Sequence, residues 1–385
     1  MTPGARVAAA IEIIDRIVDG TPAEQALTRW ARGSRFAGSK DRAAIRDHVF
    51  DHLRHWRSDA VRGGGTSGRA RMIGRLRGAG VDPSTMFDGQ GHAPAALTDA
   101  ERSAGSVPQE RGDAVDLPDW LLPHFDVSLG GDADAAARAL QDRAPVTLRV
   151  NTAIADVETV AGTLSAEGIE TVPNPRATTA LTVKTGARRV RLSNAYETGA
   201  VELQDAASQV AMAEVTGQGR ALDFCAGGGG KALALAARGW DVTAHDADAE
   251  RMRDLPARAA RGTHRIAICT PDMVQGLTEF DVVLCDAPCS GAGTWRRAPE
   301  AKWRLTPKRL QSLVDLQADI LDTAVDHVAP GGALYYATCS ILNVENFQQI
   351  ERFVERHPAW RCDEMWHWPV DGWGDGFFMA RLLRA

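Results

Sequence analysis

Two cysteines at matching positions are the residues of this 385-residue sequence that most clearly suggest chemistry. Cys289 stands in Asp286-Ala-Pro-Cys-Ser-Gly-Ala-Gly-Thr294, and Cys339 stands in Ala337-Thr-Cys-Ser-Ile341, each directly after an apolar, strand-like run. Most free cysteines are buried and inert, but loops at the ends of parallel strands line ligand clefts. Since a thiolate is a strong nucleophile, we predict catalytic roles for both cysteines.

The spacing of the cysteines and histidines indicates neither disulfides nor a metal site. None of the six forms a CxxC pair, and all lie from Cys225 onward, which is typical neither of a disulfide framework nor of a zinc ribbon. His48, His52 and His55 have helical spacing but no accompanying cysteine or acidic cluster with ligand spacing. We therefore predict reduced thiols and no metal site.

A glycine-rich segment, Asp223-Phe-Cys-Ala-Gly-Gly-Gly-Gly-Lys231, follows another strand-like run. Consecutive glycines let the backbone turn sharply and approach a ligand before a helix begins. The spacing differs from the dinucleotide fingerprint GxGxxG, and also from the P-loop, because Cys225 and Ala232 occupy positions of Gly and of Ser or Thr. We predict that this segment binds a cofactor through Cys225, Ala226, Gly227, Gly228, Gly229, Gly230 and Lys231.

Three aspartates follow later strand-like runs. Asp246 lies about 20 residues after the glycines, where a carboxylate can accept hydrogen bonds from ribose hydroxyls. Asp272 comes after the next run and is placed to meet an adenine amino group, and Asp286 opens the first cysteine motif. Asp246 and Asp272 would each, alone, be more commonly a helix cap. Together they predict an adenosine pocket.

The elements that must position these residues form an alternating pattern. Strand-like runs at 221–224, 241–245, 265–269, 280–285 and 333–337 alternate with amphipathic helices. This order predicts a doubly wound, Rossmann-like α/β sheet with ligands at the carboxyl ends of its strands. We assign residues 201–385 to this catalytic domain, and residues 131–200, with strands near 146–150, 171 and 181–183, to a small α+β module.

The N-terminal part predicts helices. Val7, Ile11, Ile14 and Val18 recur at helical spacing before Gly20. Thr21, Pro22 and Glu24 then provide an N-cap, a first-turn proline and a capping-box residue, and Asp41 can cap the following helix. We assign residues 1–80 to a helical domain and the Gly-, Pro-, Asp- and Ser-rich residues 81–130 to a linker.

Charge is unevenly distributed along the chain. The net charge is −6, yet residues 29–77 carry thirteen Arg or Lys and four Asp or Glu, a net +9. Such a segment, which includes Arg42 and Arg46, is typical of a phosphate-backbone binder, although a solvated basic helix face is the alternative. The sequence has no run of about 18 apolar residues and no leader pattern at its start, so we expect a cytoplasmic protein with no membrane partner.

These motifs together resemble the Sun/Fmu family of S-adenosylmethionine-dependent RNA cytosine-C5 methyltransferases. The resemblance spans residues 143–383 and includes Arg143-Ala-Pro-Val-Thr-Leu-Arg-Val-Asn151, Leu203-Gln-Asp-Ala-Ala-Ser-Gln209, the glycine loop, both cysteine motifs and Asp375-Gly-Phe-Phe-Met-Ala-Arg381. The N-terminal helices resemble, over the shorter stretches Asp41-Arg-Ala-Ala-Ile-Arg46 and Leu53-Arg54, a NusB-like RNA-binding domain. Two departures are Gly227-Gly228 in place of Ala-Pro and Ala232 in place of Thr.

The resemblance implies S-adenosylmethionine as cofactor and assigns roles. It makes Cys339 the nucleophile that adds to carbon 6 of cytosine and Cys289 the residue that assists elimination. The reverse assignment stays open, because the unrelated DNA cytosine methyltransferases use the cysteine of a Pro-Cys motif. The resemblance also places Asp286 at the base edge and beside the sulfonium of the cofactor, and Lys231 against the cytosine. Further RNA contacts would come from Arg149, Arg296 and Arg297.

The expected substrate is RNA, small-subunit ribosomal RNA first and transfer RNA as the alternative, with no obligate protein partner. Two functions of other classes stay open at this point: a non-catalytic RNA-binding factor of ribosome assembly, and a nucleotide-dependent enzyme that uses the glycine loop. The first is weakened by the presence of both cysteines with Asp286 and Lys231, and the second by the spacing of the loop.

Overall fold

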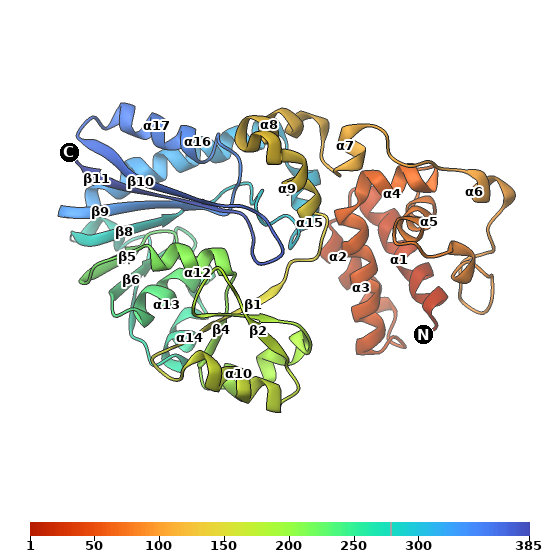
Figure 1. Ribbon diagram of the computed structural model, residues 1–385, viewed down its shortest axis with the longest axis horizontal. Helices are drawn as coiled ribbons and strands as arrows, with labels where there is room; N and C mark the ends of the chain where they lie inside the picture. The colour runs from red at the N-terminus through yellow and green to blue at the C-terminus, as the bar shows by residue number, and fades with distance from the viewer. Residues whose placement is uncertain (278) are drawn as a thin grey trace. The chain divides into compact units, whose positions relative to one another are not determined.

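A computed structural model of the protein describes residues 1–277 and 279–385, which form two compact units (Figure 1). The first unit comprises Met1–Asp126, Gly130–Arg143 and Trp295–Arg304. The second comprises Val127–Leu129, Ala144–Thr294 and Leu305–Ala385. The chain thus enters the first unit again between the two cysteine motifs.

The first unit is helical. It is built on α1 (Pro3–Val18), α2 (Ala23–Gly33), α3 (Ser39–Arg54), α4 (Trp56–Gly63) and α5 (Gly68–Gly78). Apolar side chains at helical spacing, among them Ile13, Ile14, Ile45, Val49 and Met72, form its core and are almost completely buried. The apolar stripe of α1 therefore faces this core, as its spacing predicts.

The start of α2 differs from the prediction. The helix begins at Ala23, and neither Thr21 nor Glu24 caps it. The carboxylate of Glu300 accepts the Ala23 backbone N–H instead, at 3.1 and 3.2 Å. The predicted capping box is therefore wrong, because a residue 277 positions away in the sequence satisfies the same orphan donor.

Asp41 likewise does not cap a helix. It lies in the first turn of α3, where its carboxylate pairs with the amino group of Met1 and with Arg6. The aspartate thus joins the N-terminus of the chain to α3, while Gly38 occupies the N-cap position.

Residues 81–130, which we expected to form a linker, contain short helices. These are α6 (Asp99–Ser103), α7 (Arg111–Ala114) and α8 (Leu122–Leu129), and all but the last residues of α8 belong to the helical unit together with α9 (Ala133–Ala139) and α15 (Pro299–Arg304). Arg57 holds this segment by bonding to Asp113, to the Leu117 carbonyl and to Asp119. The helical unit therefore extends beyond residues 1–80, to which the spacing of apolar residues had assigned it.

The second unit begins with a small antiparallel sheet in the order β2-β3-β1-β4. Its strands are β1 (Val146–Val150), β2 (Thr171–Pro173), β3 (Ala180–Val183) and β4 (Val201–Leu203), and α10 (Val157–Ala166) packs on one face. Strands occur where the sequence predicts them at 146–150, 171 and 181–183. β4 was not predicted.

A seven-stranded sheet follows, in the order β10-β11-β9-β8-β5-β6-β7. Strands β5 (Arg220–Asp223), β6 (Asp241–His245), β7 (Ile266–Cys269), β8 (Phe280–Asp286) and β9 (Val328–Thr338) are parallel. They confirm the predicted doubly wound α/β class. The C-terminal strands β10 (Trp360–Trp368) and β11 (Phe377–Arg384) run antiparallel at one edge and were not predicted.

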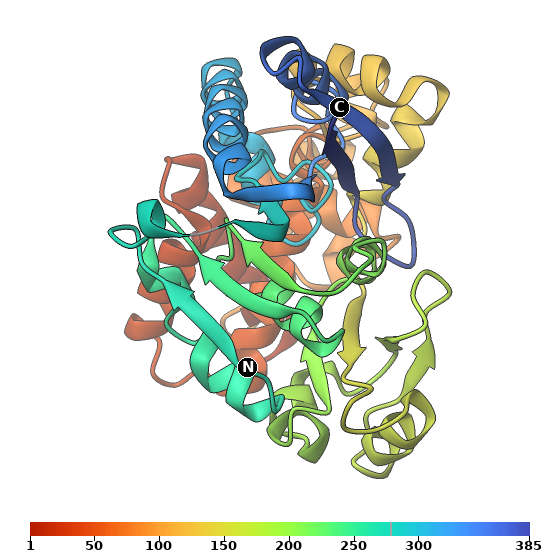
Figure 2. The same cartoon turned by 90° about the vertical axis from the view of Figure 1, so that its left-hand side faces the viewer.

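Helices cover both faces of this sheet (Figures 1 and 2). One face carries α12 (Ala206–Ala213), α13 (Gly230–Ala237) and α14 (Leu255–Arg261), and the other carries α16 (Pro307–Ala324) and α17 (Phe347–Arg356). Alternate residues of β8 therefore enter different cores: Val282 and Leu284 pack toward the first set, and Val283 and Cys285 toward the second. Within the described residues, no helix is both long enough and apolar enough to cross a membrane.

Candidate active site

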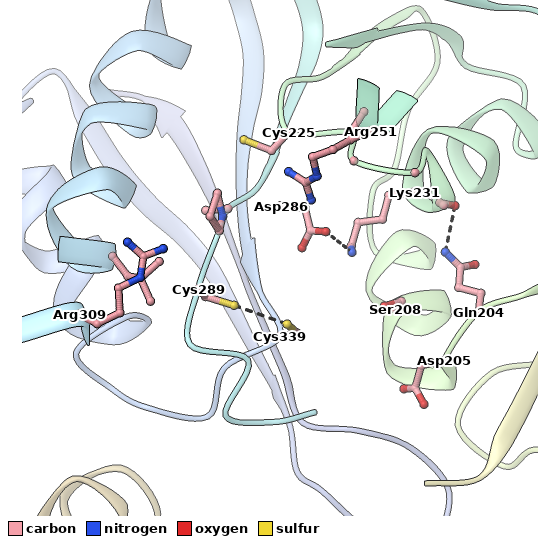
Figure 3. A pocket seen from close by; sticks show the side chains of 17 residues that line it. Gln204, Asp205, Ser208, Cys225, Lys231, Arg251, Asp286, Cys289, Arg309 and Cys339 are labelled. Atoms are coloured by element: carbon pink, nitrogen blue, oxygen red, sulfur yellow. Dashed lines mark hydrogen bonds and ion pairs between the residues drawn. The ribbon is translucent and has the colours of Figure 1, made fainter. Parts of the chain in front are cut away.

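A cavity of about 610 Å³ opens at the carboxyl ends of β5, β8 and β9 (Figure 3). This is where a parallel α/β sheet binds its ligands, since the loops after the strands meet there. The lining brings together most of the predicted site: Cys225, Ala226, Gly227, Gly228, Gly230, Lys231, Asp286, Cys289 and Cys339. All of these residues belong to the second unit.

The two predicted catalytic cysteines face each other in the cavity. Their Sγ atoms are 3.5 Å apart (Figure 3). The Thr294 hydroxyl lies 3.9 Å from the Cys339 sulfur. The hydrogen bond between the two thiols lowers the pKa of Cys339, against burial and the charge of Asp286, with help from the nearby Lys231. The same hydrogen bond, with burial, raises the pKa of Cys289 well above its ordinary value. Cys339 is therefore the more acidic thiol of the pair, and Cys289 is the less acidic one.

Lys231 and Asp286 form an ion pair beside the cysteines. The lysine comes from the first turn of α13 and the aspartate from the end of β8, and their charged atoms are 2.5 Å apart. Burial disfavours the ammonium, but the charge and the hydrogen bond of Asp286, together with the charges of Cys339 and Asp223, outweigh burial and raise the pKa of Lys231. The lysine also lies over the ring of Phe377, at 5.0 Å from its centroid. A fixed cation thus stands next to the more acidic thiol.

The glycine loop has the conformation that a cofactor cradle needs. Gly227 and Gly229 adopt positive φ angles of 53° and 78°. A Cβ on Gly229 would lie 2.3 Å from a methyl carbon of Leu255, so no other residue fits there without displacement. Gly229 does not line the cavity, but its neighbours Gly228 and Gly230 do. A narrow backbone loop beside Asp286, a carboxylate that can face a cation, fits the predicted S-adenosylmethionine.

The other two predicted carboxylates have different surroundings. Asp246 is almost completely buried and accepts bonds from the Gly227 amide at 2.8 Å and from Arg251 at 3.0 Å. It therefore orders the glycine loop, while neither it nor Asp272 belongs to the cavity lining. Asp272 is exposed and accepts a bond from the Thr270 hydroxyl. Their contacts with an adenosine stay a prediction.

Burial raises the pKa of two further side chains near the cavity, Cys225 and Asp223. Cys225 lines the cavity, but burial and the nearby Asp223 raise its pKa, which makes it a poor nucleophile. Asp223 itself is completely buried at the end of β5, and burial together with the charge of Asp286 raises its pKa to about 7.

All six cysteines are free thiols. Among the described residues, no cluster of His, Cys, Asp or Glu could hold a metal ion.

The predicted RNA contacts divide by exposure. Arg42, Arg46 and Arg297 are exposed; Arg42 bonds the Ala37 carbonyl, and Arg46 pairs with Glu24. Arg149 and Arg296 are buried to more than nine-tenths. Arg149 nevertheless lines a second, smaller cavity, and the contact of both side chains with an RNA phosphate stays a prediction.

Several lining residues had no role assigned from the sequence. Gln204, Asp205 and Ser208 lie around the start of α12, and the Gln204 amide donates to the Gly230 carbonyl at 3.0 Å. Their segment was part of the family resemblance, which is the signal that could have identified them. Arg251 and Arg309 also line the cavity (Figure 3), and Arg309 stands on α16 with no motif around it.

Comparisons with known proteins agree with this geometry. Residues 210–383 match the family described as 16S rRNA methyltransferase RsmB/F, and residues 117–190 match the ferredoxin-like domain of RsmF/B-like methyltransferases. The chain is 33% identical over 289 residues to Ribosomal RNA small subunit methyltransferase B of Xylella fastidiosa, which covers 69% of this chain and 67% of that protein. The same enzyme of Cronobacter sakazakii is also 33% identical and covers 69% and 66%.

Solved structures share the fold. The crystal structure of PH0851 matches over 99% of both chains with a TM-score of 0.77 and 24% identity. A methyltransferase homolog protein from Pyrococcus horikoshii matches 71% of this chain and 98% of its own, with a TM-score of 0.62 and 20% identity. Because the relatives from two bacteria are aligned over about two thirds of their length and the methyltransferase match contains both cysteine motifs, the chain belongs to the RsmB/F family of S-adenosylmethionine-dependent RNA methyltransferases.

Proposed function

We propose that the protein methylates carbon 5 of a cytidine in small-subunit ribosomal RNA through a covalent adduct between Cys339 and carbon 6. The observation that carries this proposal is the thiol pair itself: two sulfur atoms 3.5 Å apart line the cavity together with the ion pair of Lys231 and Asp286. The relatives are ribosomal RNA small subunit methyltransferases, which favours this substrate over transfer RNA.

The chemistry requires a nucleophile because carbon 5 of cytosine is otherwise unreactive. The Cys339 thiolate adds to carbon 6, and the ring becomes an enamine whose electron density lies at carbon 5. S-adenosylmethionine, when bound in this cavity, supplies the methyl group as an electrophile. Nitrogen 3 takes up a proton from water as carbon 6 is attacked. Asp286 hydrogen-bonds this edge of the base and stabilises the protonated ring, and Lys231 fixes Asp286 through their ion pair.

Release of the product requires removal of the carbon 5 proton. In the free enzyme Cys289 keeps its own proton, because the hydrogen bond to Cys339 and the charge on that sulfur both raise its pKa. Once Cys339 is bonded to carbon 6, both effects end and Cys289 releases its proton to water more readily. As a thiolate it can accept the proton from carbon 5, after which the bond from carbon 6 to Cys339 breaks, the double bond of the ring re-forms and nitrogen 3 returns its proton to water.

The target base must leave its stack before it can reach these groups. The exposed Arg309 lines the cavity on α16, and its guanidinium can hold a phosphate next to the flipped nucleotide. Arg42 and Arg46 remain as exposed candidates for backbone contacts from the helical unit.

The test is methyl transfer to defined RNA. We would incubate the protein with methyl-labelled S-adenosylmethionine and with unmodified ribosomal or transfer RNA, and map the product by bisulfite sequencing. We expect one labelled cytidine in small-subunit ribosomal RNA and none with Cys339→Ala. Label in transfer RNA alone would overturn the substrate, and label at a base other than cytosine would overturn the chemistry. Cofactor binding without transfer to naked RNA or ribosomal particles would support the non-catalytic alternative.

A further inference from the structure

Each catalytic cysteine is followed by a serine, and both serines bind one carboxylate. The side chain of Glu345 accepts hydrogen bonds from the Ser290 amide at 2.8 Å and from the hydroxyls of Ser290 and Ser340 at 2.5 Å each. The two hydroxyl oxygens are themselves 3.3 Å apart. One acidic side chain therefore joins the loop that carries Cys289 to the loop that carries Cys339.

Glu345 is held firmly in this position. It is completely buried, and the amide of Gln317 on α16 donates a further bond to its carboxylate at 3.1 Å. The Tyr336 hydroxyl donates to the Glu345 backbone carbonyl at 2.7 Å. Four donors on two carboxylate oxygens satisfy a buried charge and form short, charge-assisted bonds. Such a carboxylate can fix the geometry of the groups that surround it.

The strands alone do not fix the distance between the two sulfur atoms. The pairing of β8 with β9 ends at Asp286 and Ala337, so both cysteines lie beyond the paired residues. Between the two loops, one backbone bond runs from the Gly293 amide to the Cys339 carbonyl at 2.9 Å. The bonds to Glu345 act directly next to the cysteines and on both loops at once.

We propose that Glu345 is a positioning residue that, through Ser290 and Ser340, holds Cys289 at hydrogen-bonding distance from Cys339. The proposal rests on the proposed function only in that the two thiols are catalytic. It assigns a role to a completely buried residue that does not line the cavity.

The charge of Glu345 acts in the same direction as its hydrogen bonds. It is among the causes that raise the pKa of Cys289, after the hydrogen bond to Cys339, burial and the Cys339 charge. Cys339 faces two other charged groups, Asp286 from β8, which opposes its ionisation, and Lys231 from α13, which favours it. The hydrogen bond between the two thiols lowers the pKa of Cys339, and Glu345 holds the two loops at the distance that this bond requires.

The experiment measures the reactivity of each thiol without RNA. We would follow alkylation of Cys339 and Cys289 by iodoacetamide from pH 5 to 10, with site-resolved mass spectrometry, in the full-length wild type, Glu345→Gln and the double variant Ser290→Ala/Ser340→Ala. Glu345→Gln keeps the shape and removes the charge, whereas the double variant keeps the charge and removes the hydroxyls. We expect alkylation of Cys339 at pH 7 to fall about tenfold in each, with its midpoint moved to higher pH by about one pH unit.

Asn174→Ala provides the matched control. Asn174 is equally buried in the small α+β module and makes three hydrogen bonds, to Thr182, Trp373 and Arg176, none of them to a cysteine loop. We expect the Cys339 profile of this variant to equal that of the wild type. Binding of S-adenosylmethionine by calorimetry verifies that each variant is folded, and it should stay within about threefold of the wild type.

An unchanged Cys339 profile in folded Glu345→Gln and in the folded double variant would overturn the proposal. A profile that changes equally in Asn174→Ala would also overturn it, because the effect would then be general destabilisation. Since the readout needs no RNA, failure of the proposed function would appear separately, as absence of methyl transfer by the wild type.

Discussion

At the residue scale, the two cysteines differ only through their neighbours. Both follow a strand and both precede a serine, so the local sequence does not distinguish a nucleophile from its assistant. We propose Cys339 as the nucleophile, because the nearby ammonium of Lys231 lowers the pKa of its thiol. This supports one of the two assignments that the family resemblance left open, and the following experiments test it.

Replacement of the cysteines should separate addition from elimination. Cys339→Ala should reduce methyl transfer to background, because nothing else adds to carbon 6. Cys289→Ala should slow product release on the order of 10²–10⁴-fold, the usual contribution of a positioned proton acceptor, and accumulate a covalent RNA adduct. Denaturing gel electrophoresis with labelled RNA detects the adduct. An adduct in Cys339→Ala instead would reverse the two roles.

The charges beside Cys339 predict opposite effects on its reactivity. Lys231 lowers the pKa of this thiol and Asp286 raises it, so Lys231→Met should make alkylation at pH 7 slower and Asp286→Asn should make it faster. Only the thiolate reacts, and at any pH below the pKa a higher pKa leaves less of it. We expect about a tenfold difference between the two variants, measured with iodoacetamide. Changes in the same direction would contradict the electrostatic explanation.

At the element scale, the loop between β5 and α13 supplies part of the cavity lining. Gly227-Gly228 stand where the family usually has Ala-Pro, and the structure still shows a tight turn at the start of α13. The turn depends on positive φ at Gly227 and Gly229, and not on every glycine of the run. Gly228 lines the cavity, has no positive φ, and has only ordinary van der Waals contacts at its Cβ position.

Two neighbouring substitutions test this distinction. Gly229→Ala places a methyl group 2.3 Å from Leu255 in a left-handed conformation, so we expect destabilisation of about 1–3 kcal/mol and at least tenfold weaker cofactor binding. Gly228→Ala meets its nearest atom at 3.5 Å and should bind within about threefold of the wild type. Calorimetric titration with S-adenosylmethionine measures both variants. Equal losses would mean that the loop needs flexibility and not a specific conformation.

At the scale of the whole molecule, the helical unit includes a short segment that lies far along the sequence from its other helices. Residues 295–304 follow the Cys289 motif and belong to this unit, where Glu300 caps α2 and Trp303 donates to the Leu53 carbonyl at 2.7 Å. This segment also contains Arg296, which is almost completely buried, and Arg297, which is exposed.

The long-range cap should be measurable as stability. Glu300→Ala leaves the Ala23 amide without its acceptor and should lower the free energy of unfolding by about 1 kcal/mol, the usual effect of removing a helix cap. Glu12→Ala removes an exposed pair with Arg16 and should change it by less than about 0.5 kcal/mol. Urea denaturation followed at the transition of the helical unit compares the two. Equal effects would contradict the capping role of Glu300.

The sequence by itself determined the α/β class, the positions of the five parallel strands and the groups gathered at their ends. These features follow from local patterns: an apolar run defines a strand, and the residues after it come to one edge of a parallel sheet. The edge strands β10 and β11 were not predicted, because the alternation of β10 is interrupted next to a bulge between Cys362 and Glu364 and β11 shows no alternation of apolar and polar side chains. What the motifs specify is therefore the chemistry available at the site.

Only the tertiary structure decided how those groups act. The opposite pKa shifts of Cys289 and Cys339, the cap on α2 from Glu300, and the burial of Arg149 and Arg296 all depend on residues distant in the sequence. The carboxylate of Glu345 reaches both cysteine loops for the same reason. Burial and hydrogen bonding act through space, and no pattern of neighbouring residues along the chain records which side chains the fold will bring together.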